Sequence, residues 1–350
     1  MEQVQQQVVA PSTNEHCEIK QQQQLAFTVF INNAFPISQA YNKFRETNYP
    51  NFAHYITSKF GQSVCLDTSA YSVCLVFQSR TDVEASLLNK GRHAYIHALR
   101  ALQHALNSEQ ISNKPEMIGT SILLSIYEMR VPSEPHNEWS NHCLGVAALM
   151  KEMGAQSFAD GFARSCYIFF RGFLIAVAFH QQKPCFLEED QWQQLGERIR
   201  VEDSQKLGIS SIFVDVTERI FMELVKCPRY VYEAQVHQCT QNYQRALVMS
   251  SQILGTQNNL RSLVTQLKDL ISTYQPEVIP SAPGYLLKGA EDAVHLLGTL
   301  ARRLIMNPIP PLHVYSGLTW LIDNMYIAYD ARWLDEFACS MGLLGTTLVD

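Results

Sequence analysis

The chain has 350 residues, of which 47% are apolar and only 17% are Asp, Glu, Lys or Arg, and its formal net charge is −6. The length fits one large helical domain or two closely packed helical halves. The charged fraction is below the roughly 25% of an average soluble domain, so we expect helix surfaces that pack inward or against a partner. An acidic net charge gives no field that attracts phosphates, which disfavours unaided binding to nucleic acid.

Cysteine usage indicates an intracellular protein. The nine cysteines are scattered, mostly within apolar runs, and none forms a Cys-x-x-Cys pair, so we expect buried free thiols rather than zinc-ribbon or redox motifs. The N-terminus has no basic stretch followed by an apolar run, so we expect no secretory signal. The most apolar segment, Cys166 to His180, is interrupted by Arg171 and falls short of the ~20 residues that span a bilayer, so we expect no membrane contact.

The chain divides into a short tail and a long helical region. Residues 1–24 are rich in glutamine and contain too few apolar residues for a core, which predicts a disordered tail. Over residues 25–350, apolar residues recur three and four positions apart, as in helices. The sequence therefore predicts an all-α fold, either a multi-helix bundle or an irregular array of helical pairs.

The first two clear helices lie before the middle of the chain. One covers residues 83–106 and carries an apolar stripe along one face. The next follows Asn113, a helix-capping residue, and ends before Pro132. The expected buried face of this second helix consists of Ile118, Ile122, Ser125, Ile126 and Met129.

Two more helices are predicted directly downstream. One extends from Trp139 to Met153, and Gly154 stands where a left-handed capping glycine belongs. The other covers residues 158–179 and is apolar nearly all round, which is typical of a helix at the centre of a bundle.

The second half of the chain is predicted to be helical between proline-rich breaks. A helix over 212–225 should be ended by Pro228, and residues 243–274 should form one or two helices. Three prolines predict an exposed connection over 275–284, and a second break follows at 308–311. We expect helices to resume after each break.

Catalytic and metal-binding motifs are absent from the sequence, including the phosphate loops, the nucleophile elbow and the zinc-protease motif. The best metal candidates are His93, His97 and His104, which share one helical face. Because no carboxylate or cysteine supports them at a suitable spacing, we interpret them as surface residues. The sequence thus predicts no catalytic residue, no metal ligand and no cofactor.

Three other polar features have structural interpretations. The acids Glu188 to Asp190 fit a solvated helix start anchored by Trp192, since no second acidic cluster is present to hold magnesium with them. His142 lies one turn after Trp139 and is expected to be a hydrogen-bonded core histidine. Arg171 is the one charge in a long apolar helix and must find a partner if it is buried.

A series of residues across the predicted helices has a recognisable order and separation. The series is Gly91, Tyr95, Ala98, Leu99, Leu102 and Leu106, then Leu124, Tyr127 and Glu128, then Trp139, His142, Gly145, Leu149 and Gly154, and finally Arg171, residues 184–187 and Trp192. It resembles the fungal-specific transcription factor domain, the regulatory region of fungal zinc-cluster transcription factors. The resemblance covers about residues 25–340 and is clearest over 83–192.

The resemblance implies an all-α regulatory region that modulates transcription in the nucleus, often of metabolic or secondary-metabolite genes. In that family the region follows a binuclear zinc cluster with six closely spaced cysteines, whereas only Cys17 lies within the first 64 residues here. We therefore expect no direct, zinc-dependent DNA binding. Since no basic run is longer than Arg302-Arg303, an import signal is not apparent, and the cytoplasm is the alternative location.

The sequence thus predicts a non-enzymatic transcriptional regulator or co-regulator. It would bind a protein partner, either a zinc-cluster transcription factor or a second copy of itself, with aromatic residues such as Trp320 and Trp333 on the contact surface. A small-molecule effector is compatible with this interpretation. The alternatives are a helical biosynthetic accessory enzyme, a general helical scaffold protein, and a regulator that has lost its DNA-binding segment.

Overall fold

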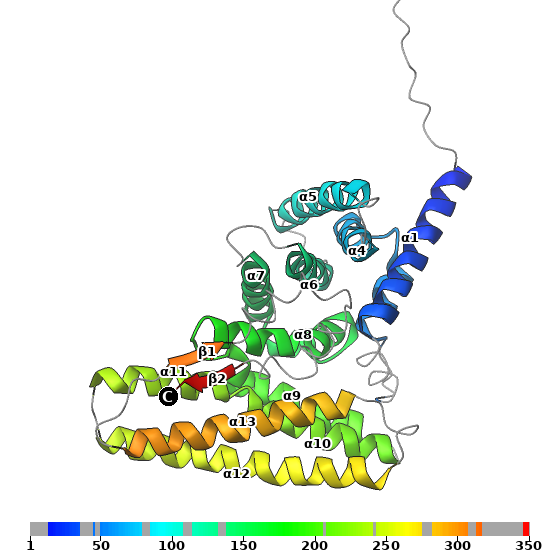
Figure 1. Ribbon diagram of the computed structural model, residues 1–350. Coiled ribbons are helices and arrows are strands. Elements are labelled where there is room, and N and C mark those ends of the chain that lie inside the picture. The colour runs from blue at the N-terminus through cyan, green and yellow to red at the C-terminus, as the bar shows by residue number, and fades with distance from the viewer. Residues whose placement is uncertain are drawn as a thin grey trace, which may run out of the picture.

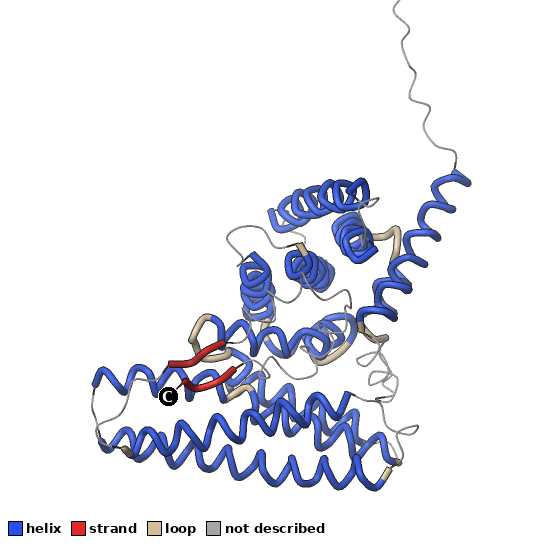
Figure 2. Tube along the Cα trace, viewed as in Figure 1, coloured by secondary structure: helices blue, strands red, loops and turns tan. Residues whose placement is uncertain are grey.

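The protein is all-α, as the sequence predicts, and a computed structural model shows its helices stacked in successive pairs (Figures 1 and 2). The structure describes residues 13–35, 45, 50–78, 85–107, 114–131, 138–205, 208–240, 243–274, 282–306, 313–316 and 346–349.

The helices follow one another with short connections. In chain order they are α1 (Thr13–Ala34), α3 (Phe52–Lys59), α4 (Val64–Gln78), α5 (Ala85–Asn107), α6 (Lys114–Arg130), α7 (Glu138–Met153), α8 (Gly161–His180), α9 (Asp190–Ser204), α10 (Ile209–Leu224), α11 (Cys227–Thr240), α12 (Tyr243–Thr273) and α13 (Ala282–Ile305). Short 3₁₀ turns over Ala155–Phe158 and Phe186–Glu188 precede α8 and α9. The helices predicted over 83–106, after Asn113 and from Trp139 to Met153 are therefore confirmed.

Large helix interfaces join neighbours in sequence: α4 to α5, α6 to α7, α9 to α10, and α12 to α13. The interface between α4 and α6, which are not consecutive, is larger than that between α9 and α10. In Figure 1, α4 to α7 lie on one side of α8, while α9, α10, α12 and α13 lie on the other. The fold is thus an irregular array of helical pairs arranged about α8.

The α8 helix is the centre of the core. It contacts α3, α6, α7 and α11, and it is buried nearly all round, as its sequence predicts. Within the described part of the chain, α8 is the helix whose length and apolar composition would suffice to cross a membrane, but 89% of its most apolar window is buried inside the protein. Its composition is therefore explained by packing against the surrounding helices.

The α6 helix is more buried than its sequence pattern indicates. The expected face is buried, and so are all the remaining residues between Met117 and Met129, because α4, α5, α7 and α8 surround the helix. Gly119 marks the closest approach, since a Cβ atom there would lie 2.9 Å from ring carbons of Phe162 in α8. Close helix packing, which a periodicity pattern does not report, makes α6 a second core helix.

The predicted tail is shorter than residues 1–24. Helix α1 begins at Thr13, so the prediction of disorder is wrong for residues 13–24, and residues 1–12 lie outside the described part of the chain. Phe27, Phe30 and Ile31 are buried and hold the helix on the core. The side-chain amide of Gln24 also donates a hydrogen bond to the Thr57 carbonyl. A buried C-terminal half can thus extend a helix into a glutamine-rich segment, since glutamine has good helix propensity.

Glycine and proline lie at the helix ends as expected, with three corrections. Gly154 follows α7 with a φ of 75°, a value that favours glycine, but its ψ of 153° is extended and not the left-handed helical conformation predicted for a capping glycine. Pro228 does not merely end α10: it lies in the first turn of α11, where its missing N–H costs no helical hydrogen bond. The predicted connection over 275–284 is also too long, because α13 begins at Ala282; residues 275–281 lie outside the described part of the chain.

The sequence predicts that helices resume after the second proline break. This prediction is wrong for the first residues described after that break, which form a strand. Two short strands, β1 (His313–Ser316) and β2 (Thr346–Val349), pair antiparallel, with Val314 opposite Leu348. β-branched and aromatic residues suit an extended backbone, and two pairing segments satisfy each other's backbone groups. Residues 317–345, including Trp320 and Trp333, lie outside the described part of the chain.

Candidate functional site

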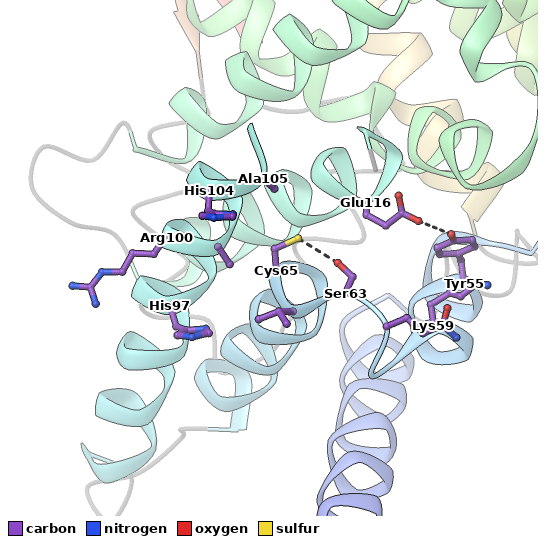
Figure 3. A pocket seen from close by; sticks show the side chains of 12 residues that line it. Tyr55, Lys59, Ser63, Cys65, His97, Arg100, His104, Ala105 and Glu116 are labelled. Carbon is purple, nitrogen blue, oxygen red and sulfur yellow. Dashed lines mark hydrogen bonds between the residues drawn. The ribbon is translucent and has the colours of Figure 1, made fainter. Parts of the chain in front are cut away.

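A pocket of about 720 Å³ opens between α3, α4, α5 and the first turn of α6 (Figure 3). Tyr55 and Lys59 of α3 line it on one side, and the face of α5 from His97 to Ala105 lines it on the other. The turn over residues 62–65 lies between these two sides, and Glu116 completes the lining. A cavity of this size is within the range of small-molecule sites.

Local structure fixes the α3 side of the pocket. The Asn51 side chain caps α3 by accepting a hydrogen bond of 2.8 Å from the His54 amide. Phe52 and Ile56 bury one face of this short helix, which leaves Tyr55 on the next face. The Tyr55 ring stacks on Phe162 of α8 with 3.8 Å between the ring centroids, so the phenol is held in place.

Tyr55 and Glu116 form a hydrogen-bonded pair between α3 and α6 at the pocket. The Tyr55 hydroxyl donates to Glu116 Oε1 at 2.9 Å. Burial, together with the hydrogen bond to Glu116, raises the pKa of Tyr55 to about 12. The phenol is therefore protonated at neutral pH and acts as a hydrogen-bond donor.

The histidines considered as metal ligands separate in the structure. All three are exposed on α5, but only His97 and His104 line the pocket, whereas His93 lies beyond it. In the part of the chain that the structure describes, no three His, Cys, Asp or Glu side chains come together in a group that could hold a metal ion. The pocket instead combines two histidines with Lys59 and Arg100.

The other polar residues singled out from the sequence have structural contacts. His142 Nε2 and the Tyr95 hydroxyl lie 3.1 Å apart in a part-buried hydrogen bond, as predicted for this histidine. Trp192 is fully buried and anchors the first turn of α9. Glu188 departs from the solvated interpretation, since it is part-buried and bonded to Arg229 of α11 at 2.7 Å.

Arg171, which the sequence predicts to need a partner, is paired with Glu218 of α10. The Arg171 guanidinium makes hydrogen bonds of 2.5 and 2.7 Å to the two carboxylate oxygens of Glu218. Arg45 bridges Glu218 and Asp203, and Arg164 binds Asp203 and Glu202. We call these six residues the buried charge network.

Both partners in the centre of the network stay charged. Burial alone would raise the pKa of Glu218, but the neighbouring guanidinium groups of Arg171 and Arg45 outweigh burial and hold the pKa at about 2. Burial alone would lower the pKa of Arg171, but Glu218 raises it above its ordinary value. The Arg171–Glu218 pair therefore links α8 to α10 through ionised groups shielded from water, whereas Glu202, at the edge of the network, is 37% exposed.

Cysteine chemistry does not mark a site in the described part of the chain. Cys65, Cys74, Cys143, Cys166, Cys185 and Cys227 are buried free thiols, as the sequence predicts. Burial raises the pKa of Cys143 to about 12 and that of Cys185 to about 12, which suppresses the reactive thiolate. These thiols are therefore packing residues.

Exposed apolar side chains gather where α12 begins and α13 ends. The two helices run antiparallel, with Gln257 Nε2 donating to the Val294 carbonyl at 2.8 Å and Ser250 Oγ donating to the Ala301 carbonyl at 3.4 Å. Tyr243, Leu247, Val248, Ile305 and Met306 are each between 42% and 61% exposed, and we call them the end patch. A cluster of this kind is typical of a contact surface.

Comparison with known proteins identifies one informative relative. The chain is 32% identical over 260 residues to an uncharacterized protein of Emericella nidulans, an alignment that covers 73% of this chain and 54% of that protein. The chain thus spans about half the length of the curated relative it matches. No protein-family model matches the sequence, and no solved structure matches it.

Proposed function

We propose that the protein is a transcriptional regulator or co-regulator that acts by binding another protein in the nucleus. The resemblance to the regulatory region of fungal zinc-cluster transcription factors supports this role. An all-α body and a relative in the fungus Emericella nidulans are consistent with that resemblance. The partner is a zinc-cluster transcription factor or a second copy of this chain, and the regulated genes form a metabolic or secondary-metabolite set.

The end patch is the observation that carries the binding role. Five large apolar side chains lie exposed at the start of α12 and at, or directly after, the end of α13, two helices that pack against each other. Removal of such side chains from water on association is favourable by about 25 cal/mol per Å² of apolar surface. A partner helix laid along the start of α12 would bury Tyr243 and Leu247, which are one turn apart on the same face.

Contact with protein rather than DNA fits the charge of the chain. The net charge is −6, so binding to phosphates would need a local basic surface to overcome a general repulsion. In the proposed role, the protein therefore reaches its target genes through its partner. Binding, not catalysis, is its proposed activity.

The first test compares transcripts of cells with and without the gene. We expect a coordinated change in a defined set of genes. The double variant Leu247→Ser/Ile305→Ser should reproduce the deletion, because it removes the centre of the end patch. The matched control Ile212→Ser changes an equally exposed isoleucine on α10 and should restore normal expression. An unchanged transcript profile in the deletion strain would contradict the proposal.

A helical biosynthetic accessory enzyme is the second candidate, and the pocket between α3 and α6 favours it. Tyr55, His97, His104 and Glu116 are titratable groups around one cavity, as in many active sites. Unchanged transcripts together with the loss of one metabolite would support this function instead.

A further inference from the structure

The exposed face of α5 carries a row of basic side chains. Lys90, His93, His97, Arg100 and His104 follow one another at spacings of three, four, three and four residues, which places them along one side of the helix. All five side chains are exposed. We call these residues the basic stripe, and at 1.5 Å per residue it extends for about 21 Å.

No acidic side chain of α5 balances the basic stripe. The helix contains neither Asp nor Glu, although the chain as a whole has a net charge of −6. Within the described part of the chain, no member of the stripe forms an ion pair. The acids of α4 and α6, which pack against α5, are Asp67, Glu116 and Glu128; the first two accept hydrogen bonds from other residues and the third is buried. The stripe is therefore solvated and available to a negatively charged partner.

The basic groups are spread along the helix rather than gathered at one point. Successive members lie roughly 5 Å apart along the axis, and Figure 3 shows Arg100 extending away from the cavity that His97 and His104 line. A small anion would contact one of these groups at a time, whereas an extended acidic partner can contact them in series. A helix with carboxylates three and four residues apart has the matching spacing.

The pocket between α3 and α5 lies along one edge of the basic stripe. Three members of the stripe, His97, Arg100 and His104, also line this cavity of about 720 Å³, as do Ala101 and the 63% exposed Val64. Exposed ion pairs contribute at most about 1 kcal/mol each, so charge alone gives weak and unselective binding. An apolar side chain buried in the pocket would add affinity and fix the position of the partner.

We propose that α5 is a docking surface for an acidic helix of a partner protein. Carboxylates of that helix lie opposite the basic stripe, and one large apolar side chain enters the pocket. Protein is favoured over nucleic acid because three of the five basic groups are histidines, whose neutral form donates a hydrogen bond to a carboxylate but adds no charge to attract phosphates. This surface is separate from the end patch, since α5 and α12 lie on opposite sides of α8 (Figure 1).

The test uses the full chain and a labelled peptide of about 20 residues, the length of a short helix, held helical by a hydrocarbon staple. Its glutamates recur three and four positions apart on one face, and one leucine lies at the edge of that face. Fluorescence anisotropy compares it with a peptide in which lysine replaces each glutamate and with one whose glutamates are redistributed around the helix. We expect the first peptide to bind at least about tenfold more tightly than either control. Equal binding of either control would overturn the proposal.

Variants of the protein locate the surface. The double variant Lys90→Glu/Arg100→Glu should raise the Kd of the acidic peptide at least about tenfold, because two attractive contacts become repulsive. The matched control Lys183→Glu/Arg261→Glu makes the same change of net charge at exposed residues outside α5 and should leave the Kd unchanged. Equal Kd values in the two double variants would overturn the assignment to α5.

The pocket has a test of its own. Replacement of the peptide's leucine by alanine should weaken binding to the natural protein about tenfold, through the loss of apolar burial. In Ala101→Leu, whose added side chain fills part of the pocket, the two peptides should bind alike. Equal binding of both peptides to the natural protein would contradict the role of the pocket, and so would an undiminished preference for leucine in the variant.

Two other anionic partners are excluded by direct comparison. Single-stranded DNA with the same number of negative charges, and vesicles of equal parts phosphatidylcholine and phosphatidylserine, should each bind at least about tenfold more weakly than the acidic peptide. Tighter binding of either one would overturn the assignment to a protein partner. These measurements use purified protein and do not depend on the regulatory role, which the transcript comparison tests separately.

Discussion

The protein uses charged side chains in two different ways on the two sides of α8. Toward α9 and α10, Arg164 and Arg171 are buried and bonded to carboxylates at 2.5 to 2.7 Å. Toward α4 and α5, Lys59 and Arg100 remain accessible around a pocket that contains one carboxylate. The first region therefore has matched charges shielded from water, and the second has an excess of solvated positive charge.

This contrast separates structural charges from charges that are available to a ligand. A buried guanidinium must be neutralised within the fold, since an unpaired buried charge is very costly. A solvated cation has no such requirement and can exchange water for an anion. Substitutions should thus act on stability in the buried charge network and on binding along α5 and its pocket.

Glu218→Gln should have the largest effect on stability. The variant leaves Arg171 without its buried carboxylate and Arg45 with Asp203 alone, and it should cost about 3–5 kcal/mol of the free energy of unfolding. Urea denaturation of the purified protein measures this loss. The control Glu197→Gln removes one partner of an exposed pair on α9 and should cost less than about 1 kcal/mol. Equal effects of the two variants would contradict the distinction.

The Glu218 carboxylate should also make the stability of the protein sensitive to acid. Its pKa falls from an ordinary 4.5 to about 2 in the folded protein, so its contribution to stability is complete above 4.5 and is lost as the pH falls toward 2. Denaturation curves over this range should show a steep loss of stability in the natural protein. Glu218→Gln should flatten the curve, and an identical slope in the variant would refute the assignment.

Gly119→Ala should have the next largest effect. The added methyl group would lie 2.9 Å from the Phe162 ring and should cost about 1–3 kcal/mol through overpacking. The control Gly145→Ala adds a methyl group on α7 with no neighbouring atom within 4 Å, and it should stabilise the helix by about 0.5–1 kcal/mol. Thermal unfolding should therefore show shifts of opposite sign.

Asp67, beside the pocket, should make stability depend on pH in the opposite direction and to a smaller extent. Burial raises its pKa from 3.8 to about 6, although the Gly61 amide and Lys20 oppose the change. Its contribution is complete below 3.8 and is lost as the pH rises through 6. Stability relative to Asp67→Asn should fall across this interval by on the order of 1 kcal/mol. A rise across the same interval would show that the sign is wrong.

Pocket substitutions should have the smallest effect on stability. Lys59→Gln and His104→Gln change side chains that make no ion pair with a described residue, so each should change the free energy of unfolding by less than about 0.5 kcal/mol. Urea denaturation is again the measurement. A loss comparable with that of Glu218→Gln would mean that the pocket charges are structural after all.

The sequence could predict one member of the buried charge network but none of the pocket, and the reasons differ. Arg171 stood out as a lone charge in an apolar helix, so its need for a partner was predictable. Its partner Glu218 was not identified, although an acid one turn after the buried Val214 of α10 was a usable signal. The pocket left no such signal, because Tyr55, the α5 face and Glu116 come from separate segments whose approach depends on packing.

Hydrophobic periodicity likewise could not predict which helix faces are buried on both sides or where a helix begins. The expected face of α6 is buried, but the opposite face is buried too, since helices on both sides enclose it. In α1, the buried Phe27 and Phe30 extend helical structure back to Thr13, across residues whose composition indicated a tail. Tertiary contacts thus changed the extent and burial of elements whose existence the pattern had predicted.

By itself, the sequence determined the all-α class, the helices α5 to α8, α10 and α12, and the end of α7 at Gly154, because hydrophobic spacing and helix breakers act over a few neighbouring residues. Only the tertiary structure decided the pairing of Arg171 with Glu218, the second buried face of α6, the strands β1 and β2, and the pocket beside Lys59. Each of these depends on residues far apart in the chain that meet only when the helices pack around α8.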